Sequence, residues 1–360
     1  MTVRTLFREE HQRLRTALRG FIESEMNPNC APMRNPGLAD REVWRKAGAN
    51  GLLCATLPRP YDAGQIDATP GIVMLEEFGR ANRPDFLGAA LHSVRAARLI
   101  AYHGNDALKS GYLPRIAAGE WIGAVADAVA ESQTYDAVAR ADLHVTAVRV
   151  ADHYIVSGVQ RLVANGHQAD LVIVPVVTDP TGSADSSSLL VVDTSMPGFS
   201  KGPGIRDHNR RWCGPADLHF DEVPVPVENL LGEESAGYRY LAQERPWYWM
   251  EVPVSAVAWM EAVLESTSPC TCRRCLLCET RTEVDAARAS IDGCIEHLLS
   301  GMLSSEDALM ARQRISHLVG SVLGTCPAFE RDGGYWLSLL QAESPSIVTA
   351  GHPSMAERNR

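Results

Sequence analysis

The chain has 360 residues, of which 45% are hydrophobic and 22% charged, a balance typical of a folded protein with two or three packed units. Its net charge of −10 excludes an overall electrostatic attraction to nucleic acid or to anionic lipid, so neither is an expected partner. No apolar run approaches a membrane span and the first residues contain no apolar signal core, so a cytoplasmic protein is predicted.

Residues 1–118 are predicted to form an N-terminal α-helical domain. In the first segment apolar residues such as Leu14, Leu18 and Phe21 return every three to four positions, as one buried helix face requires. Further helices are predicted at about 41–49, 71–82, 86–103 and 105–118.

Residues 119–232 are predicted to form a small antiparallel β-sandwich or barrel, because short β-rich runs alternate there with turn-forming residues. The predicted strands are Trp121–Val125, Val145–Val150, Tyr154–Val159, Leu171–Val177 and Leu189–Asp193. The segment Val223–Val227, in which valine alternates with proline, is expected to end the β domain as an exposed extended stretch.

Residues 233–360 are predicted to form a C-terminal helical domain. Ala256, Trp259, Met260 and Val263 form one apolar stripe. Two more helices are predicted at Thr282–Leu299 and Ser305–Cys326, the second preceded by Ser304 and Asp307 in capping-box spacing. The order is therefore helices, sheet, helices, which defines an α+β protein.

The junction F-D-E-V-P-V-P-V-E-N-L-L-G-E-E-S-A-G-Y-R-Y-L, at 220–241, strongly resembles the strand-to-helix junction of the acyl-CoA dehydrogenase family. Other matching words are W-R-K-A-G-A-N-G-L-L (44–53), Y-L-P-R-I-A-A-G-E (112–120), A-N-G-H-Q-A-D-L-V-I-V (164–174) and T-E-V-D-A-A-R-A (282–289). The resemblance implies the acyl-CoA dehydrogenase fold and covers residues 5–265 and 282–335. It also implies an acyl thioester as substrate, linked to CoA or to a carrier protein.

In enzymes of this family a glutamate removes the α proton of the thioester while hydride passes to FAD. In one branch that glutamate lies near the C-terminus, where the matching position here is Thr349, and a threonine is no base at neutral pH. In the other branch it lies on the first helix after the junction. An alignment without gaps places Tyr248 at that position, whereas a rival alignment with a gap inside the helix offers Glu244.

Glu251 follows Tyr248 by three residues and would share its helix face. These two residues are a candidate acid/base pair, with Tyr248 as the proton donor. The alternative is that Glu251 is simply solvated, as most helical glutamates are.

The resemblance also implies an FAD site, but several of its residues are replaced here. At the position of the family's threonine-glutamate-proline motif, this chain has a segment beginning at Ala128. At the position of the next motif that packs on the flavin, it has Leu162-Val163-Ala164-Asn165. The C-terminal glycine pair is Gly333-Gly334, now preceded by Glu330 and Asp332, whose charges would repel a pyrophosphate. These replacements argue against tight FAD binding, although FAD remains a possible cofactor.

The loop that contacts a neighbouring subunit's FAD in the family is missing, and a cysteine-rich segment at 266–281 stands in its place. Cys270, Cys272, Cys275 and Cys278 are dense enough for zinc or an iron–sulfur cluster. Structural zinc sites usually join two separated pairs, so a decayed loop or an out-of-frame stretch is the simpler interpretation, and no metal is predicted.

Three functions follow from the resemblance. The first is a divergent protein that acts on an acyl thioester, in biosynthesis or acyl catabolism, without ordinary dehydrogenation. The second is an FAD-dependent α,β-dehydrogenase with Glu244 as base. The third is a non-catalytic partner of an active homologue. A homodimer or homotetramer, or a heteromer with a homologue, is the expected assembly.

Overall fold

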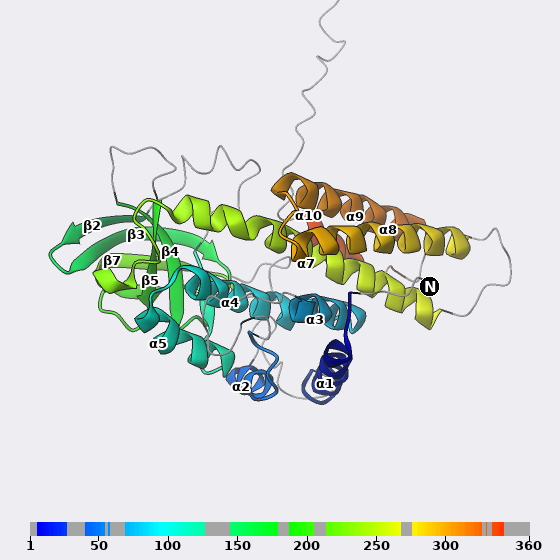
Figure 1. Cartoon of the computed structure of the whole chain (residues 1–360), viewed down its shortest axis with the longest axis horizontal. Coiled ribbons are helices and arrows are strands. Elements are labelled where there is room, and N and C mark those ends of the chain that lie inside the picture. The colour runs from blue at the N-terminus through cyan, green and yellow to red at the C-terminus, as the bar shows by residue number, and fades with distance from the viewer. Residues whose placement is uncertain are drawn as a thin grey trace, which may run out of the picture.

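The computed structural model describes residues 6–26, 40–54, 57, 69–126, 145–178, 187–204, 214–267, 276–325, 329 and 333–341. The chain begins with the helices α1 (Glu9–Glu25), α2 (Arg41–Ala49), α3 (Thr69–Arg80), α4 (Pro84–His103) and α5 (Asp106–Ala117). A sheet follows, and the chain ends with α7 (Gly237–Ser266), α8 (Leu276–Leu299), α9 (Ser305–Thr325) and α10 (Gly333–Gln341). The predicted α+β class, with helices on either side of a sheet in chain order, is confirmed (Figure 1).

The sheet contains seven strands and differs from the predicted antiparallel sandwich or barrel. Its path is β1-β4-β2-β3-β7-β6, with β5 on β4. Both β1 and β2 pair with β4 in the parallel sense, whereas the other strand pairs are antiparallel as predicted, so the sheet is mixed. Parallel pairing requires a long connection, which the intervening segments supply. The strands are β1 (Gly123–Val125), β2 (Val145–Val150), β3 (His153–Val163), β4 (Leu171–Val177), β5 (Ser187–Asp193), β6 (Phe199–Lys201) and β7 (Ala216–Pro226).

The valine–proline stretch belongs to β7 and is not an exposed tail. Val223 and Val225 are fully buried and pair with Val156 and Tyr154 of β3. On the other side of β7, β6 pairs only with Leu218–Phe220. Prolines are tolerated in a strand whose nitrogens face an edge without a ladder partner, which explains why this sequence can pair and still carry two of them. The short helix η3 (Val227–Asn229) then leads toward α7.

Helix α7 packs against helices from both the N-terminal and the C-terminal parts of the chain. It runs 30 residues through Pro246 and Pro253 without interruption. Figure 1 shows it passing from the sheet to the C-terminal helices, and it contacts α3, α4, α8, α9 and α10. Gly79 of α3 lies so close to the Ser255 carbonyl of α7 that a Cβ there would be 2.2 Å from its oxygen. A small residue is therefore required where α3 and α7 meet.

The predicted start of α9 is confirmed, whereas that of α8 is not. The Ser304 hydroxyl oxygen accepts the Asp307 amide proton at 3.0 Å, which confirms the predicted cap before α9. Helix α8 begins at Leu276, six residues before the predicted Thr282, and so takes in part of the cysteine-rich segment. No helix within the described ranges is long and apolar enough to cross a membrane.

Candidate functional site

The predicted base position lies where α7 faces α4. Glu244 of α7 is buried, and its Oε2 atom lies 2.5 Å from Nη2 of Arg98 on α4. The two side chains are 7% and 10% exposed. The atoms are close but not aligned as a hydrogen bond, so the contact is chiefly an ion pair. Glu244 therefore neutralises a buried cation.

Tyr248 and Glu251 lie one turn apart on α7, and the Tyr248 ring contacts Arg95 of α4. Glu251 is 9% exposed, so the alternative that it is a solvated surface residue is wrong. Tyr248 is partly buried. Residues separated by three positions on a helix occupy the same face, so the two side chains leave α7 on the same side.

Two arginines of α4 stack on successive aromatic residues of α7. The guanidinium carbon of Arg95 lies 4.8 Å from the ring centre of Tyr248, and that of Arg98 lies 4.8 Å from the ring centre of Trp247. Both arginines are at least nine-tenths buried. Such contacts strengthen when water is excluded, and they fix α7 against α4 at the predicted base position.

The start of α7 is held by a separate set of contacts. The Tyr240 ring stacks on His103 of α4 with ring centres 3.8 Å apart, and the Tyr240 hydroxyl oxygen accepts the Glu233 amide proton at 3.1 Å. Burial lowers the pKa of His103 despite the nearby Glu244 carboxylate. A neutral ring is the form that packs against Tyr240 at lowest cost.

His92 connects α4 to the sheet. Its Nε2 atom accepts the Val125 amide proton at 3.1 Å, which leaves Nδ1 to carry the ring proton. Burial, together with the positive charge of Arg95, lowers the pKa of His92 from its ordinary value of 6.5 to about 3. His92 is therefore a neutral acceptor that fixes the end of β1.

Replacing His92 by glutamine is expected to reduce the loss of stability on acidification. Glutamine keeps an acceptor for the Val125 amide but has no titratable ring. In the wild type, His92 takes up a proton below pH 6.5 in the unfolded chain but only near pH 3 in the folded chain. The stability contributed by neutral His92 is present above 6.5 and is lost as the pH falls toward 3. Urea unfolding at about pH 7 and about pH 5 should show a smaller difference in the variant than in the wild type. The exposed His167, changed to glutamine, is the control and should leave that difference unchanged.

The positions predicted to pack on FAD are mostly apolar. Leu162 has a φ of 52°, and its amide donates to Asp217 Oδ1 at 2.9 Å. Val163 is buried, and Ala164 packs against the main hydrophobic core. Asn165 is fully buried, and its Nδ2 atom donates to the carbonyl oxygens of Ala89 and Gly123. Its Oδ1 atom has no hydrogen-bond partner among the described residues. It is the only buried polar side-chain atom within 162–165 that is available to a ligand.

The remaining predicted FAD positions add little polar surface. A Cβ on Gly333 would lie 2.1 Å from Leu323 Cδ2, so this glycine serves packing between α10 and α9. Gly334 faces open space. Ala128 lies outside the described residues, as do Thr349, Glu330 and Asp332. The described positions therefore fit a flavin poorly, since they supply one unpaired acceptor and otherwise only backbone groups and hydrocarbon.

The cysteine segment can be followed only at its end. Cys270, Cys272 and Cys275 lie outside the described residues, and Cys278 is on the first turn of α8, partly buried. Within the described part of the chain, no three histidine, cysteine or acidic side chains are grouped as metal ligands.

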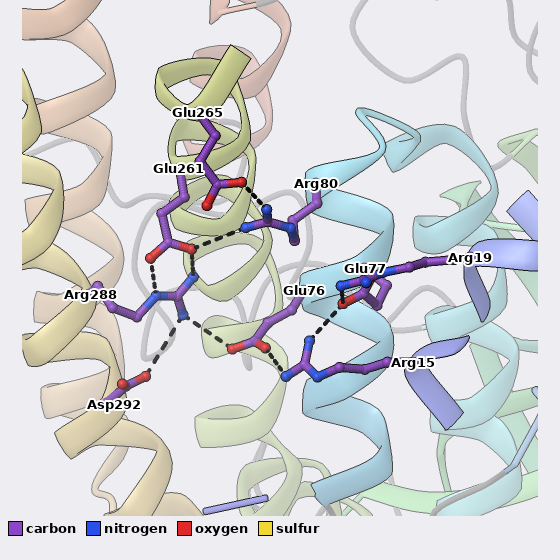
Figure 2. A network of polar contacts seen from close by, with 9 residues as sticks. All are labelled: Arg15, Arg19, Glu76, Glu77, Arg80, Glu261, Glu265, Arg288 and Asp292. Atoms are coloured by element: carbon purple, nitrogen blue, oxygen red, sulfur yellow. Dashed lines mark hydrogen bonds and ion pairs between the residues drawn. The ribbon is translucent and has the colours of Figure 1, made fainter. Parts of the chain in front are cut away.

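Sequence reasoning missed a network of nine charged residues between α1, α3, α7 and α8. Glu76 and Glu77 of α3 are each 2% exposed and occupy its centre (Figure 2). Arg15 of α1 binds both, with distances of 2.5 and 2.7 Å. Arg288 of α8 contacts Glu76 at 3.2 Å and donates twice to Glu261 of α7. The other members are Arg19, Arg80, Glu265 and Asp292.

This charged network lies on a different part of α7 from the Arg98–Glu244 pair. Glu261 is near the C-terminal end of that helix, whereas Glu244 is in its first third. Most of its partners also reside on α1, α3 and α8 instead of α4. The network is therefore a structural joint between N-terminal and C-terminal helices, separate from the candidate site. Members in direct contact are separated by as many as 212 positions in the chain, so no local sequence pattern reveals the network.

Comparisons with known proteins agree with the fold. Residues 8–120 match the family model described as acyl-CoA dehydrogenase, N-terminal domain. The long-chain specific acyl-CoA dehydrogenase of Mus musculus mitochondria is 29% identical over 354 residues, which cover 92% of this chain and 80% of that protein.

Two solved structures illustrate the range of similar folds. The acyl-CoA dehydrogenase from Geobacillus kaustophilus superposes with a TM-score of 0.80 at 26% identity, covering 95% of this chain and 97% of that one. The prolyl acyl carrier protein oxidase AnaB has a TM-score of 0.77 at 21% identity, with 94% of each chain covered, and shares the fold alone. The helix–sheet–helix architecture and these matches show that the chain belongs to the acyl-CoA dehydrogenase family.

Proposed function

We propose that this protein acts on an acyl thioester by proton transfer, with Tyr248 and Glu251 as its acid and base, and is not an ordinary FAD-dependent dehydrogenase. The observation that carries this proposal is the contact between Glu244 and Arg98, both buried. Because of this contact, the carboxylate of Glu244, the alternative base, serves as the counter-charge of Arg98.

A general base must accept a proton during the reaction. If Glu244 accepted one, the Arg98 guanidinium would remain buried without its counter-charge, which costs several kcal/mol. Glu251 is buried on the same helix, and dry surroundings make a carboxylate a stronger base. We therefore assign the base to Glu251.

The proposed reaction is redox-neutral and balanced. Glu251 takes the α proton of the thioester, and the C–H electron pair forms a carbon–carbon double bond as a β substituent leaves with its own bonding pair. Tyr248 donates its phenolic proton to that leaving group, for example to a β-hydroxyl that departs as water. Proton transfer from Glu251 back to Tyr248 restores both groups. No oxidant or reductant is consumed.

The poor fit of the flavin positions is consistent with this proposal. Leu162, Val163 and Ala164 offer hydrocarbon where the family uses aromatic and hydroxyl side chains, and Asn165 alone keeps a buried acceptor. Buried hydrogen bonds are worth about 1–3 kcal/mol each when one partner is lost, so several losses weaken a ligand considerably. If FAD binds, Asn165 is the residue of this word that would contact it, and the flavin would supply hydride acceptance.

The carrier of the acyl group can be CoA or a protein. The mouse relative is named for an acyl-CoA substrate, and AnaB is named for a substrate carried by a protein. We propose an acyl thioester as the common substrate class, three domains at 1–118, 119–232 and 233–360, and a homodimer or homotetramer as the assembly. Pairing with an active homologue is the alternative.

The ultraviolet–visible spectrum of the purified protein tests the proposal. We expect no flavin absorption, no recovery of it when FAD is added, and heat of binding when straight-chain acyl-CoA thioesters are titrated in. A flavin band that an acyl-CoA bleaches, and that Glu244→Gln leaves unbleached, would establish dehydrogenation with Glu244 as base. Co-purification with a homologous chain, without thioester binding by this chain alone, would instead establish the partner role.

A further inference from the structure

Arg95 and Arg98 occupy successive turns of α4 and make the same type of contact with α7, but their chemical settings differ. Arg98 stacks on Trp247 and has the Glu244 carboxylate 2.5 Å away. Arg95 stacks on Tyr248, whose ring carries an ionisable hydroxyl, with 4.8 Å between the guanidinium carbon and the ring centre. Arg95 therefore places a cation against a group that can become an anion.

The field of Arg95 is strong at this place because water is largely excluded. Arg95 is 6% exposed, and its charge contributes to holding His92, one turn earlier on α4, in the neutral form. The titratable and charged residues along this stretch of α7 are Glu244, Arg245, Tyr248 and Glu251, of which Tyr248 contacts Arg95. A cation a few ångströms from a phenol ring stabilises the negative charge left when that phenol loses its proton.

We propose that Arg95 is a positioning residue for Tyr248: it fixes the phenol ring against α4 and stabilises the phenolate that remains after proton donation. The phenolic O–H bond breaks, the proton goes to the leaving group of the substrate, and the electron pair stays on the tyrosine oxygen. The geometry for this role is present in the Arg95–Tyr248 stack. The inference rests on the proposed acid role of Tyr248.

The ionisation of Tyr248 can be measured without substrate. The ultraviolet absorbance of tyrosinate is followed against pH, and the signal of Tyr248 is the difference between each protein and the same protein carrying Tyr248→Phe. In Arg95→Met we expect Tyr248 to ionise about one pH unit higher than in the wild type, because the neighbouring cation is gone. Arg95→Lys keeps a charge but loses the planar stack, so an intermediate shift is expected.

Arg115→Met is the matched control, because the Arg115 guanidinium also lies 4.8 Å from an aromatic ring, that of Trp121, in a different part of the fold. It should leave the Tyr248 titration unchanged. Circular dichroism checks that each variant is folded, and Arg95→Lys keeps the test valid if Arg95→Met does not fold. Ionisation of Tyr248 at the wild-type pH in either folded Arg95 variant would overturn the inference.

Turnover separates this inference from the proposed function. If Tyr248→Phe retains full activity while the Arg95 variants shift the titration, the acid role is wrong and the electrostatic contact stands. If Tyr248→Phe is inactive and the titration does not move, the acid role stands and Arg95 has no part in it. When both hold, Arg95→Met should lower kcat by about 10-fold to 100-fold, with KM changed far less.

Discussion

Changing Glu76 to glutamine is expected to lower the free energy of unfolding by about 3 kcal/mol. Glu76 is 2% exposed and lies between Arg15 of α1 and Arg288 of α8. Neutralising it leaves two largely buried guanidiniums with less counter-charge, and that desolvated charge destabilises the folded state. Glutamine has nearly the volume of glutamate, so a packing defect contributes little. Urea unfolding followed by circular dichroism measures the effect.

The control for this prediction is Glu9→Gln. Glu9 pairs with Arg13 at 2.6 Å, but the two side chains are 82% and 77% exposed. Exposed pairs contribute about 0–1 kcal/mol, so this change should alter stability by no more than about 0.5 kcal/mol. Equal effects of the two changes would contradict the view that burial makes the network a structural joint.

Tyr248→Phe and Glu251→Gln are each expected to reduce turnover of an acyl thioester by about 100-fold to 10,000-fold, the usual contribution of a positioned acid or base. Glu251 is buried and lies one turn from Tyr248 on α7. Because the two groups act on one reaction, the double variant should be little slower than the slower single variant. Steady-state rates on a β-hydroxyacyl thioester, with product identified by mass, provide the measurement.

Glu244→Gln separates the two proposed bases. It removes the charge that faces Arg98, so we expect a fall in stability but a kcat within about 10-fold of the wild type in the folded protein. A variant that unfolds normally yet turns over as slowly as Glu251→Gln would identify Glu244 as the base. Wild-type rates in both Tyr248→Phe and Glu251→Gln would remove the acid/base pair altogether.

The sequence predicted most elements because they depend on local pattern. The strand limits Val145–Val150 and Leu171–Val177 match the structure residue for residue. Leu171–Val177 is a continuous apolar run between Asp170 and Thr178, and such a short bounded run marks a buried strand directly. The Ser304 cap is equally local. The sequence failed for β7, where the prolines suggested an exposed tail, because the side of a strand that lacks a partner depends on the position of β6.

The candidate site follows the same division. Sequence alone placed Glu244, Tyr248 and Glu251 on one helix after the junction, because helical periodicity and the matching family words are properties of the chain itself. The pairing of Glu244 with a cation was decided only by the tertiary structure, in which α4 brings Arg98 against Glu244 across 146 positions of the chain.

The buried charged residues show why other features of the molecule could not be predicted from the sequence. Two adjacent glutamates on a helix usually indicate a solvent-exposed face. Glu76 and Glu77 are nevertheless buried, because arginines from α1 and α8 contact them. Burial of a charge is stable only when its partners arrive from elsewhere in the fold. The amino-acid sequence thus determined the family, the helix–sheet–helix order and the candidate residues, whereas long-range packing decided which cations lie against the buried carboxylates Glu76, Glu77 and Glu244.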